Sequence, residues 1–139
     1  MKKNTFILLL VSIIGVAVIS STSCKKDDPA PTQENFVIQV DSIIHPDTIA
    51  FGDTLKILFY GLVGPDGCYQ FQEWYNEFDV GLIQITTKGV HYFNINCAQG
   101  EVYMDGFEYK LIGVPKGDYT IKIVQPDNST LDSPLNVKE

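Results

Sequence analysis

The strongest constraint on the fold is an alternation of apolar and polar residues that begins at Phe36 and runs to the C-terminus. Phe36, Ile38 and Val40 would share one face of a strand, and the pattern is cleanest over 119–123. A period of two residues is typical of strands with one buried face, whereas an amphipathic helix needs a period of 3.6. Residues 36–139 are therefore expected to form one all-β domain.

Turn-forming Gly, Pro, Asn and Asp residues interrupt this alternation at short intervals, as at 64–67 and 126–128. The segments between them predict seven or eight strands: 36–40, 55–60, 68–78, 82–87, 90–97, 107–111, 119–123 and 135–138. Pro134 and Lys138 favour an edge position for the last strand, because proline cannot donate a backbone hydrogen bond and lysine discourages pairing with another chain. Short strands at this spacing are typical of an antiparallel β-sandwich.

The first 35 residues follow a different pattern. Two lysines precede an uncharged apolar run over 6–19, and small polar residues lead to Cys24. This order is typical of a secretory signal peptide. The run would make about 21 Å of helix, short of a hydrocarbon core of about 30 Å, so a permanent membrane span is the weaker interpretation. We expect a cleaved signal at 1–23 and a flexible, proline-bearing tether at 24–35.

Residues 19–24 (ISSTSC) resemble the lipobox of bacterial lipoproteins, in which the peptidase cuts before a cysteine that carries a diacylglyceryl thioether. Ser21 and Ser23 depart from the commonest lipobox, as they do in lipoproteins of one large Gram-negative phylum. In that phylum a stretch such as 25–28 (KKDD) resembles a signal for export to the outer leaflet of the outer membrane. The resemblance implies an acylated Cys24 and an outer-membrane protein at the cell surface, with the inner leaflet as the alternative.

The charge of the chain excludes one class of partner. The full chain carries −7, and removal of Lys2 and Lys3 with the signal would leave −9, with no arginine at all. An acidic protein without arginine lacks the electrostatic footprint of a nucleic-acid-binding protein. It would also be repelled by an anionic membrane surface, so the lipid itself must hold it there.

Two cysteines remain after Cys24, namely Cys68 and Cys97. In an oxidising compartment an even pair predicts a disulfide, with two free thiols as the alternative. A metal site would need further ligands at short spacing, and His45 and His91 stand in no such spacing. We therefore expect no metal and no cofactor.

Residues 114–121 (VPKGDYTI) resemble the E–F corner of immunoglobulin-like and fibronectin type III-like domains. The resemblance implies a tyrosine corner, in which Gly117 supplies backbone freedom and the Tyr119 hydroxyl bonds back to the chain. Ile121 stands where an immunoglobulin has cysteine, and Trp74 follows Cys68 too closely for the usual cysteine–tryptophan core. The prediction is therefore an immunoglobulin-like topology; residues 65–71 also resemble a segment of uncharacterised small lipoproteins, which implies no activity.

The segment 68–78 is rich in aromatic residues, and two interpretations of it stay open. Tyr69, Phe71, Trp74 and Tyr75 could form an exposed stacking surface for sugar or peptide, or they could pack in the core. The sequence contains no nucleophile-elbow, zinc-protease or phosphate-loop motif, so we expect no enzyme. A cleft that gathers His91 with a serine and an aspartate would indicate otherwise.

Three triplets share the order Asp, then Ser or Thr, then an aliphatic residue. They contain Ser42, Thr48 and Thr54 and lie close together. The triplet resembles an O-glycosylation signal of exported proteins in the same Gram-negative phylum; the alternative is that these residues simply start strands after turns.

These observations lead to one expected function and two rivals. We expect a lipid-anchored, non-catalytic binding or adhesion module of the cell envelope, with a protein or carbohydrate ligand. The rivals are a structural accessory subunit of an outer-membrane assembly and, with less support, a hydrolase with an unorthodox site.

Overall fold

The computed structural model describes residues 32–93 and 95–139, and this part of the chain is built of strands. The strands are β1 (Thr32–Val37), β2 (Ser42–Ile44), β3 (Thr48–Ala50), β4 (Leu55–Asp66), β5 (Tyr69–Asp79), β6 (Leu82–Phe93), β7 (Gln99–Leu111), β8 (Gly117–Val124) and β9 (Thr130–Lys138). Within these residues no helix is long and apolar enough to cross a bilayer. The predicted signal peptide and the predicted acylation of Cys24 lie outside the described residues.

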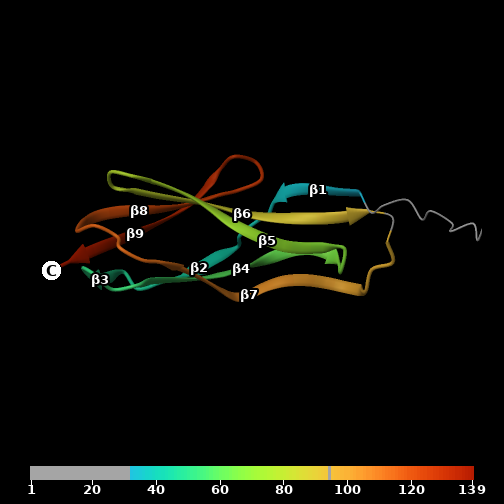
Figure 1. The fold of residues 1–139 in the computed structure, drawn as a ribbon, viewed down its shortest axis with the longest axis horizontal. Coiled ribbons are helices and arrows are strands. Elements are labelled where there is room, and N and C mark those ends of the chain that lie inside the picture. Colours follow the sequence, from blue (N-terminus) through green and yellow to red (C-terminus); the bar gives the residue numbers. More distant parts are fainter. Residues whose placement is uncertain (1–31, 94) are drawn as a thin grey trace, which may run out of the picture. The chain divides into compact units, whose positions relative to one another are not determined.

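The strands form two sheets that pack face to face (Figure 1). The three-stranded sheet has the order β2-β4-β7, and the six-stranded sheet has the order β1-β6-β8-β9-β3 with β5 on the other edge of β6. β8 and β1 lie along the same edge of β6: β8 pairs with its first half and β1 with its second half. The predicted all-β sandwich of two sheets is confirmed.

The pairing is not antiparallel throughout. β6 pairs with β8, and β3 with β9, in the parallel sense. The first pair is parallel because the chain leaves β6, crosses to β7 in the opposite sheet, and crosses back to β8 in the direction of β6. An immunoglobulin-like sandwich has antiparallel sheets, so this pair is a departure from the predicted topology.

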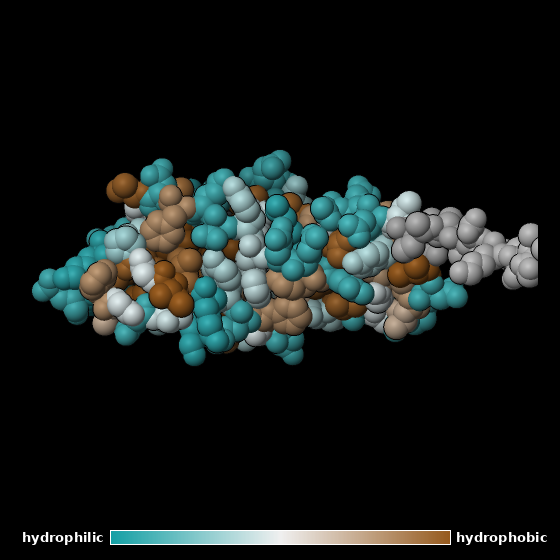
Figure 2. Space-filling view, viewed as in Figure 1, coloured by the Kyte–Doolittle hydropathy of each residue, from teal (hydrophilic) through white to brown (hydrophobic). Residues whose placement is uncertain are grey.

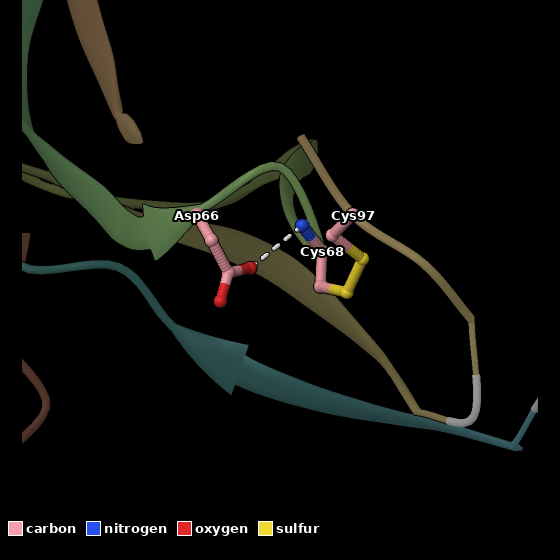
Figure 3. A group of neighbouring side chains, drawn as sticks. All are labelled: Asp66, Cys68 and Cys97. Carbon is pink, nitrogen blue, oxygen red and sulfur yellow. Dashed lines mark hydrogen bonds between the residues drawn. A yellow bond between two sulfur atoms is a disulfide. The ribbon is translucent and has the colours of Figure 1, made fainter. Parts of the chain in front are cut away.

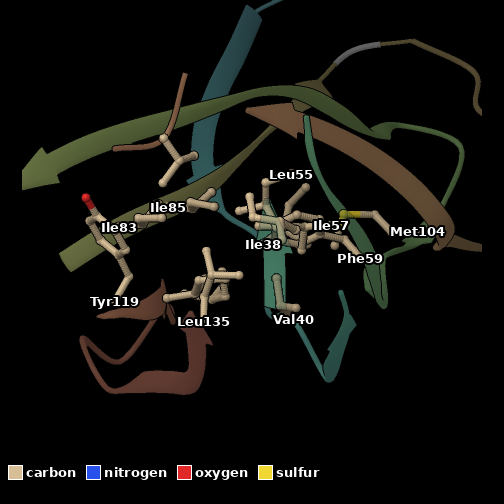
Figure 4. Packing of buried hydrophobic residues seen from close by; sticks show 14 of the residues in the cluster. Ile38, Val40, Leu55, Ile57, Phe59, Ile83, Ile85, Met104, Tyr119 and Leu135 are labelled. Carbon is tan, nitrogen blue, oxygen red and sulfur yellow. The ribbon is translucent and has the colours of Figure 1, made fainter. Parts of the chain in front are cut away.

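Alternation along the strands places one apolar face of each sheet in a shared core (Figure 4). The fully buried side chains are those of Ile38, Leu55, Ile57, Phe59, Ile83, Ile85, Met104, Val114, Ile121, Ile123 and Thr87. Phe36 packs against this core and Val40 is buried within it, so the predicted face of the segment 36–40 is confirmed.

Several predicted boundaries are wrong. The predicted strands 82–87 and 90–97 are replaced by one strand, β6, which ends at Phe93, so residues 95–97 are not in a strand. Gly89 is not in a turn, because the Phe36 ring lies where a Cβ would be. The turn expected at 64–67 comes later, since β4 runs to Asp66 and the chain reverses at Gly67 and Cys68.

The ends of the domain also differ from the prediction. β1 begins at Thr32, so the last residues of the predicted tether belong to the sandwich. β9 is an edge strand only in part: beyond Pro134, which pairs with β8 alone, Asn136 to Lys138 also pair with β3. The short strands β2 and β3 are not among the predicted strands, although they begin at Ser42 and Thr48, as the alternative interpretation of the Asp-Ser and Asp-Thr triplets has it.

Candidate binding site

The sandwich has two ends that differ in character. At the end we call the Thr32 end, β1 starts beside the last residue of β6, since Thr32 pairs with Phe93. The opposite end, the Val80 end, consists of the turns and loops 51–54, 80–81 and 112–116 (Figure 1). The β5–β6 turn is tight, with Asp79 opposite Leu82 and Gly81 at a φ of 72°.

The Val80 end exposes large apolar side chains to solvent. Val80 is 99% exposed, Ile112 78%, Phe51 57% and Phe78 43%. Apolar surface is visible at this end in Figure 2. Soluble proteins seldom gather such side chains without a function, since contiguous exposed apolar patches commonly mark interaction sites.

Two adjoining hollows lie at the same end, each with a volume of about 540 Å³. They share Gly81, Asp118 and Tyr119. The first is lined further by Phe78, Asp79, Val80, Pro115, Lys116 and Gly117, and the second by Asp47, Thr120, Pro134, Leu135 and Asn136. Together they make one shallow groove with Tyr119 on its floor.

Carboxylates dominate the charge around this groove. Asp118 accepts a hydrogen bond from the Asn136 side chain, and Asp79 accepts one from the Val80 backbone at 2.7 Å. Lys116 is already engaged, because its Nζ lies 2.6 Å from Glu139 and 5.5 Å from the centre of the Phe51 ring. The groove is therefore apolar at its centre and acidic at its rim.

The predicted tyrosine corner is only half present. Gly117 has a φ of 143°, a conformation that favours glycine, and a Cβ there would lie 3.8 Å from the Tyr119 ring. The Tyr119 hydroxyl, however, bonds to none of the described residues and points away from the core (Figure 4). The ring packs against Phe78 at 5.6 Å, so Tyr119 forms the wall between core and groove.

The aromatic residues of β5 lie mostly in the core. A register shift between Phe71 and Glu73 adds one residue to the strand, so Trp74 faces the same side as Tyr69 and Phe71. These three rings are half-buried and pack against the core. Of the four candidate residues, only Tyr75 stands outside, 50% exposed, with Lys88 Nζ 4.9 Å from its ring centre. A continuous aromatic platform is therefore not formed.

The buried aromatic rings close the seam between the two sheets. Phe71 meets Phe107 edge to face at 5.6 Å, and Trp74 lies 5.3 Å from Tyr109. Burial raises the pKa of the Tyr109 hydroxyl. The Trp74 Nε1 is buried without a hydrogen-bond partner among the described residues. Packing of this kind explains the aromatic richness of β5 without a ligand.

The Thr32 end is held by a covalent bond. Cys68 and Cys97 form the predicted disulfide, with Cα atoms 5.2 Å apart, and Asp66 accepts a hydrogen bond from the Cys68 backbone at 2.8 Å (Figure 3). The carboxylate and the two sulfurs lie within 4.8 Å of one another, a spacing that would suit a metal ion. Sulfurs joined in a disulfide cannot bind as thiolates, so the oxidised protein offers one carboxylate here.

Neither histidine forms the predicted sign of a hydrolase. His91 stacks on Tyr69 at 4.0 Å and contacts the Phe93 ring at 4.1 Å. His45 makes two contacts that the sequence did not predict. Its Nε2 lies 2.8 Å from Ser133 Oγ, and its Nδ1 lies 2.9 Å from the Pro46 carbonyl oxygen.

The His45–Ser133 contact pairs the residue types that serve as general base and nucleophile in hydrolases. Because a carbonyl only accepts, Nδ1 donates to Pro46, and in the neutral ring Nε2 then accepts from the serine hydroxyl. Among the described residues no carboxylate bonds to His45, and Ser133 lines neither hollow. The pair fastens the β2–β3 connection to β9.

The three predicted glycosylation residues are all exposed. Ser42 is in β2, Thr48 is in β3 and Thr54 directly precedes β4. Exposure is required of an acceptor hydroxyl and is also usual at strand ends. Glycosylation stays a prediction.

Comparison with known proteins adds no relative from which a role could be transferred. No protein-family model, no curated protein and no solved structure matches the chain.

Proposed function

We propose that this chain is a lipid-anchored, non-catalytic binding module of the bacterial cell surface, which engages a protein partner with its Val80 end. The observation that carries the proposal is the exposure of Val80 and Phe78, which line a groove at one end of the sandwich, with Ile112 and Phe51 exposed in loops at the same end. An acylated Cys24 would stand eight residues before Thr32, where β1 begins. The lipid would thus hold one end, and the opposite end would be presented to partners.

The chemistry of the Val80 end favours protein over carbohydrate as the partner. Sugar sites use flat aromatic faces, and the rings of Tyr69, Phe71 and Trp74 are half-buried and pack against the core. Val80 and Ile112 are aliphatic side chains that protrude, and such anchors fit apolar pockets on a partner protein. The acidic rim formed by Asp79 and Asp118 would select a partner with basic groups around that pocket.

A photo-cross-linking amino acid at residue 80 tests the proposal in intact cells. The matched control carries the same amino acid at Gln70, which is exposed on β5 near the other end of the sandwich. We expect a discrete protein adduct from position 80 that is lost when Ile112→Asp is added, and no such adduct from position 70. Adducts at both positions, or at neither, would refute the assignment of the Val80 end.

Anchoring is tested separately by metabolic labelling with palmitate. Label should enter the wild-type chain and be absent from Cys24→Ser. Label that persists in Cys24→Ser would overturn the lipid anchor while leaving the assignment of the Val80 end in place.

A further inference from the structure

Three side chains that can bind a metal ion meet where the turn between β4 and β5 touches the residues that precede β7. They are Asp66, Cys68 and Cys97, and a carboxylate oxygen and the two sulfurs all lie within 4.8 Å of one another (Figure 3). Within residues 32–93 and 95–139, no second set of three cysteine, histidine or acidic side chains is arranged in this way. We call these three residues the Asp66 cluster.

Backbone contacts hold the two cysteines together independently of the S–S bond. Gly67 N donates to the carbonyl oxygen of Ala98 at 2.9 Å, and Asp66 pairs with Gln99 in the register of β4 and β7. The approach is close, since a Cβ at Gly67 would lie 3.3 Å from the Ala98 Cβ. Ala98 directly follows Cys97, so reduction leaves the two thiols next to each other in the folded chain.

The Asp66 carboxylate forms no ion pair within the described part of the chain. It is half-buried, and it accepts a hydrogen bond from Cys68 N at 2.8 Å. A carboxylate has two oxygens, so one can keep this hydrogen bond while the other binds a metal ion. Asp66 is thus the further ligand that the spacing of the cysteines and histidines did not predict.

Two thiolates and one carboxylate form a donor set that suits Zn²⁺. Thiolates select soft and borderline ions over Ca²⁺ and Mg²⁺, which prefer oxygen ligands. Tetrahedral zinc lies about 2.3 Å from each sulfur, which sets two sulfurs about 3.8 Å apart. The Cα atoms of Cys68 and Cys97 are 5.2 Å apart, so rotation about the two Cα–Cβ bonds supplies this separation once the S–S bond is broken. Water would complete the fourth position.

We propose that the Asp66 cluster binds Zn²⁺ when the disulfide is reduced and releases it when the disulfide forms again. Reduction consumes two molecules of a thiol reductant: their sulfurs join in a new disulfide, and Cys68 and Cys97 each gain a proton. Zinc then displaces these two protons and bonds to both thiolates and to Asp66. In the reverse direction a small-molecule disulfide takes two electrons from the thiolate pair and two protons from water and becomes two thiols. The S–S bond forms again and the ion is set free.

Cys97 is the sulfur that a reductant reaches. It is half-buried and lies outside the strands, whereas Cys68 is 9% exposed. A thiolate of the reductant therefore attacks Cys97, and the Cys68 thiolate leaves first. The cluster is at the Thr32 end, so the proposal is independent of partner binding at the Val80 end.

The first test uses the chain from residue 24 with Cys24→Ser, in which Cys68 and Cys97 are the only cysteines. The chain is reduced with a phosphine, freed of it without oxygen and titrated with Co²⁺, a visible substitute for Zn²⁺ whose bonds to thiolates absorb in the near ultraviolet. We expect one Co²⁺ per reduced chain, displaced by one Zn²⁺, and no Zn²⁺ retained by the oxidised chain in equilibrium dialysis. A reduced chain without the Co²⁺–thiolate absorption, or an oxidised chain that binds Zn²⁺ equally well, overturns the proposal.

Matched variants test the third ligand. Asp66→Asn keeps an oxygen that accepts from Cys68 N but loses the charge, so it should weaken Zn²⁺ binding about tenfold or more. Asp79→Asn removes another turn carboxylate that accepts a backbone hydrogen bond, at the opposite end, and should change the affinity less than about twofold because the distant charge is screened. Equal affinities in the parent and Asp66→Asn overturn the proposal. A reduced chain that had unfolded would give this same result, since its thiols would bind without Asp66.

The second test asks whether zinc replaces the tie that reduction removes. An ion that binds the folded chain better than the unfolded chain raises its stability, so Zn²⁺ should raise the urea midpoint of the reduced parent. Mg²⁺ at the same concentration should not, and Asp66→Asn should show a smaller rise with Zn²⁺. A parent midpoint that Zn²⁺ leaves unchanged overturns the proposal, because the ion would then bind the folded and unfolded chains alike.

Discussion

The two ends of the sandwich differ: one is cross-linked by a disulfide, and the other exposes apolar side chains to solvent. The Thr32 end is tied by the Cys68–Cys97 disulfide and by the ring of Tyr69 stacked on His91. The Val80 end has no covalent tie in the described residues, and it leaves Val80 and Ile112 in solvent. The covalent tie thus lies at one end, while the other end carries exposed side chains that do not stabilise the fold. Loss of the disulfide and substitution of an exposed residue such as Val80 should therefore have opposite consequences for stability and binding.

The largest effect on stability is expected from the disulfide. Its loop spans 29 residues, and in the chain-entropy model such a bond stabilises the fold by about 3.5 kcal/mol. The Cys68→Ser, Cys97→Ser double variant should lose that amount in urea unfolding and keep its β-sheet circular dichroism. The single variant Val80→Asp serves as the control at the other end. A double variant as stable as the parent would show that the Thr32 end is held by packing alone.

The next effect concerns Tyr119, which separates the core from the groove. Tyr119→Ala should cost about 3 kcal/mol, because it removes a buried ring from between Phe78 and the core. Tyr119→Phe should cost less than about 0.5 kcal/mol, because the hydroxyl has no hydrogen-bond partner to lose among the described residues. Urea midpoints of both variants measure this. A loss near 1 kcal/mol in Tyr119→Phe would mean that the hydroxyl is bonded in solution, as the tyrosine-corner interpretation required.

A smaller loss is expected at Gly89, on the Thr32 side of β6. A Cβ at this position would lie 2.5 Å from the tip of the Phe36 ring and 3.0 Å from Ile38, so Gly89→Ala should destabilise the fold by about 1–3 kcal/mol. Phe36→Leu removes the ring tip that causes the clash. Adding it should therefore recover part of the loss, and additive losses in the double variant would contradict the packing argument.

Gly89 also shows why the boundaries of β6 cannot be predicted from the sequence alone. Alternation identified the buried faces of 36–40 and 119–123 correctly, because a period of two is a local property of a strand. A glycine in such a strand, however, predicts a turn unless one knows which ring lies over it, and Phe36 is far away in the sequence. The alternation pattern does not identify β2 and β3, because strands of three residues are too short to show a period of two.

The site was harder to predict than the fold. The cysteine pair could be inferred from count and compartment alone, and it is confirmed. The inward position of Trp74 depends on a one-residue register shift after Phe71, which no side-chain pattern signals. The groove joins segments from β3 to β9, so only the folded chain brings Asp47 and Asp118 together. No sequence pattern predicts the exposed positions of Val80 and Ile112, because a single apolar residue in a turn or loop has no periodic partner.

The smallest expected effect on stability completes the comparison of the two ends. Val80 is 99% exposed, so Val80→Asp removes no buried surface and should change the unfolding free energy by less than about 0.5 kcal/mol. The same substitution should abolish the partner adduct formed by a photo-cross-linker placed at Phe78, because a carboxylate cannot be buried in an apolar pocket without a large desolvation cost. Gln70→Asp, an equally exposed change near the other end, should leave that adduct intact. If Val80→Asp destabilised the chain by more than 1 kcal/mol, the β5–β6 turn would belong to the stabilising part of the molecule, and the division between the ends would fail.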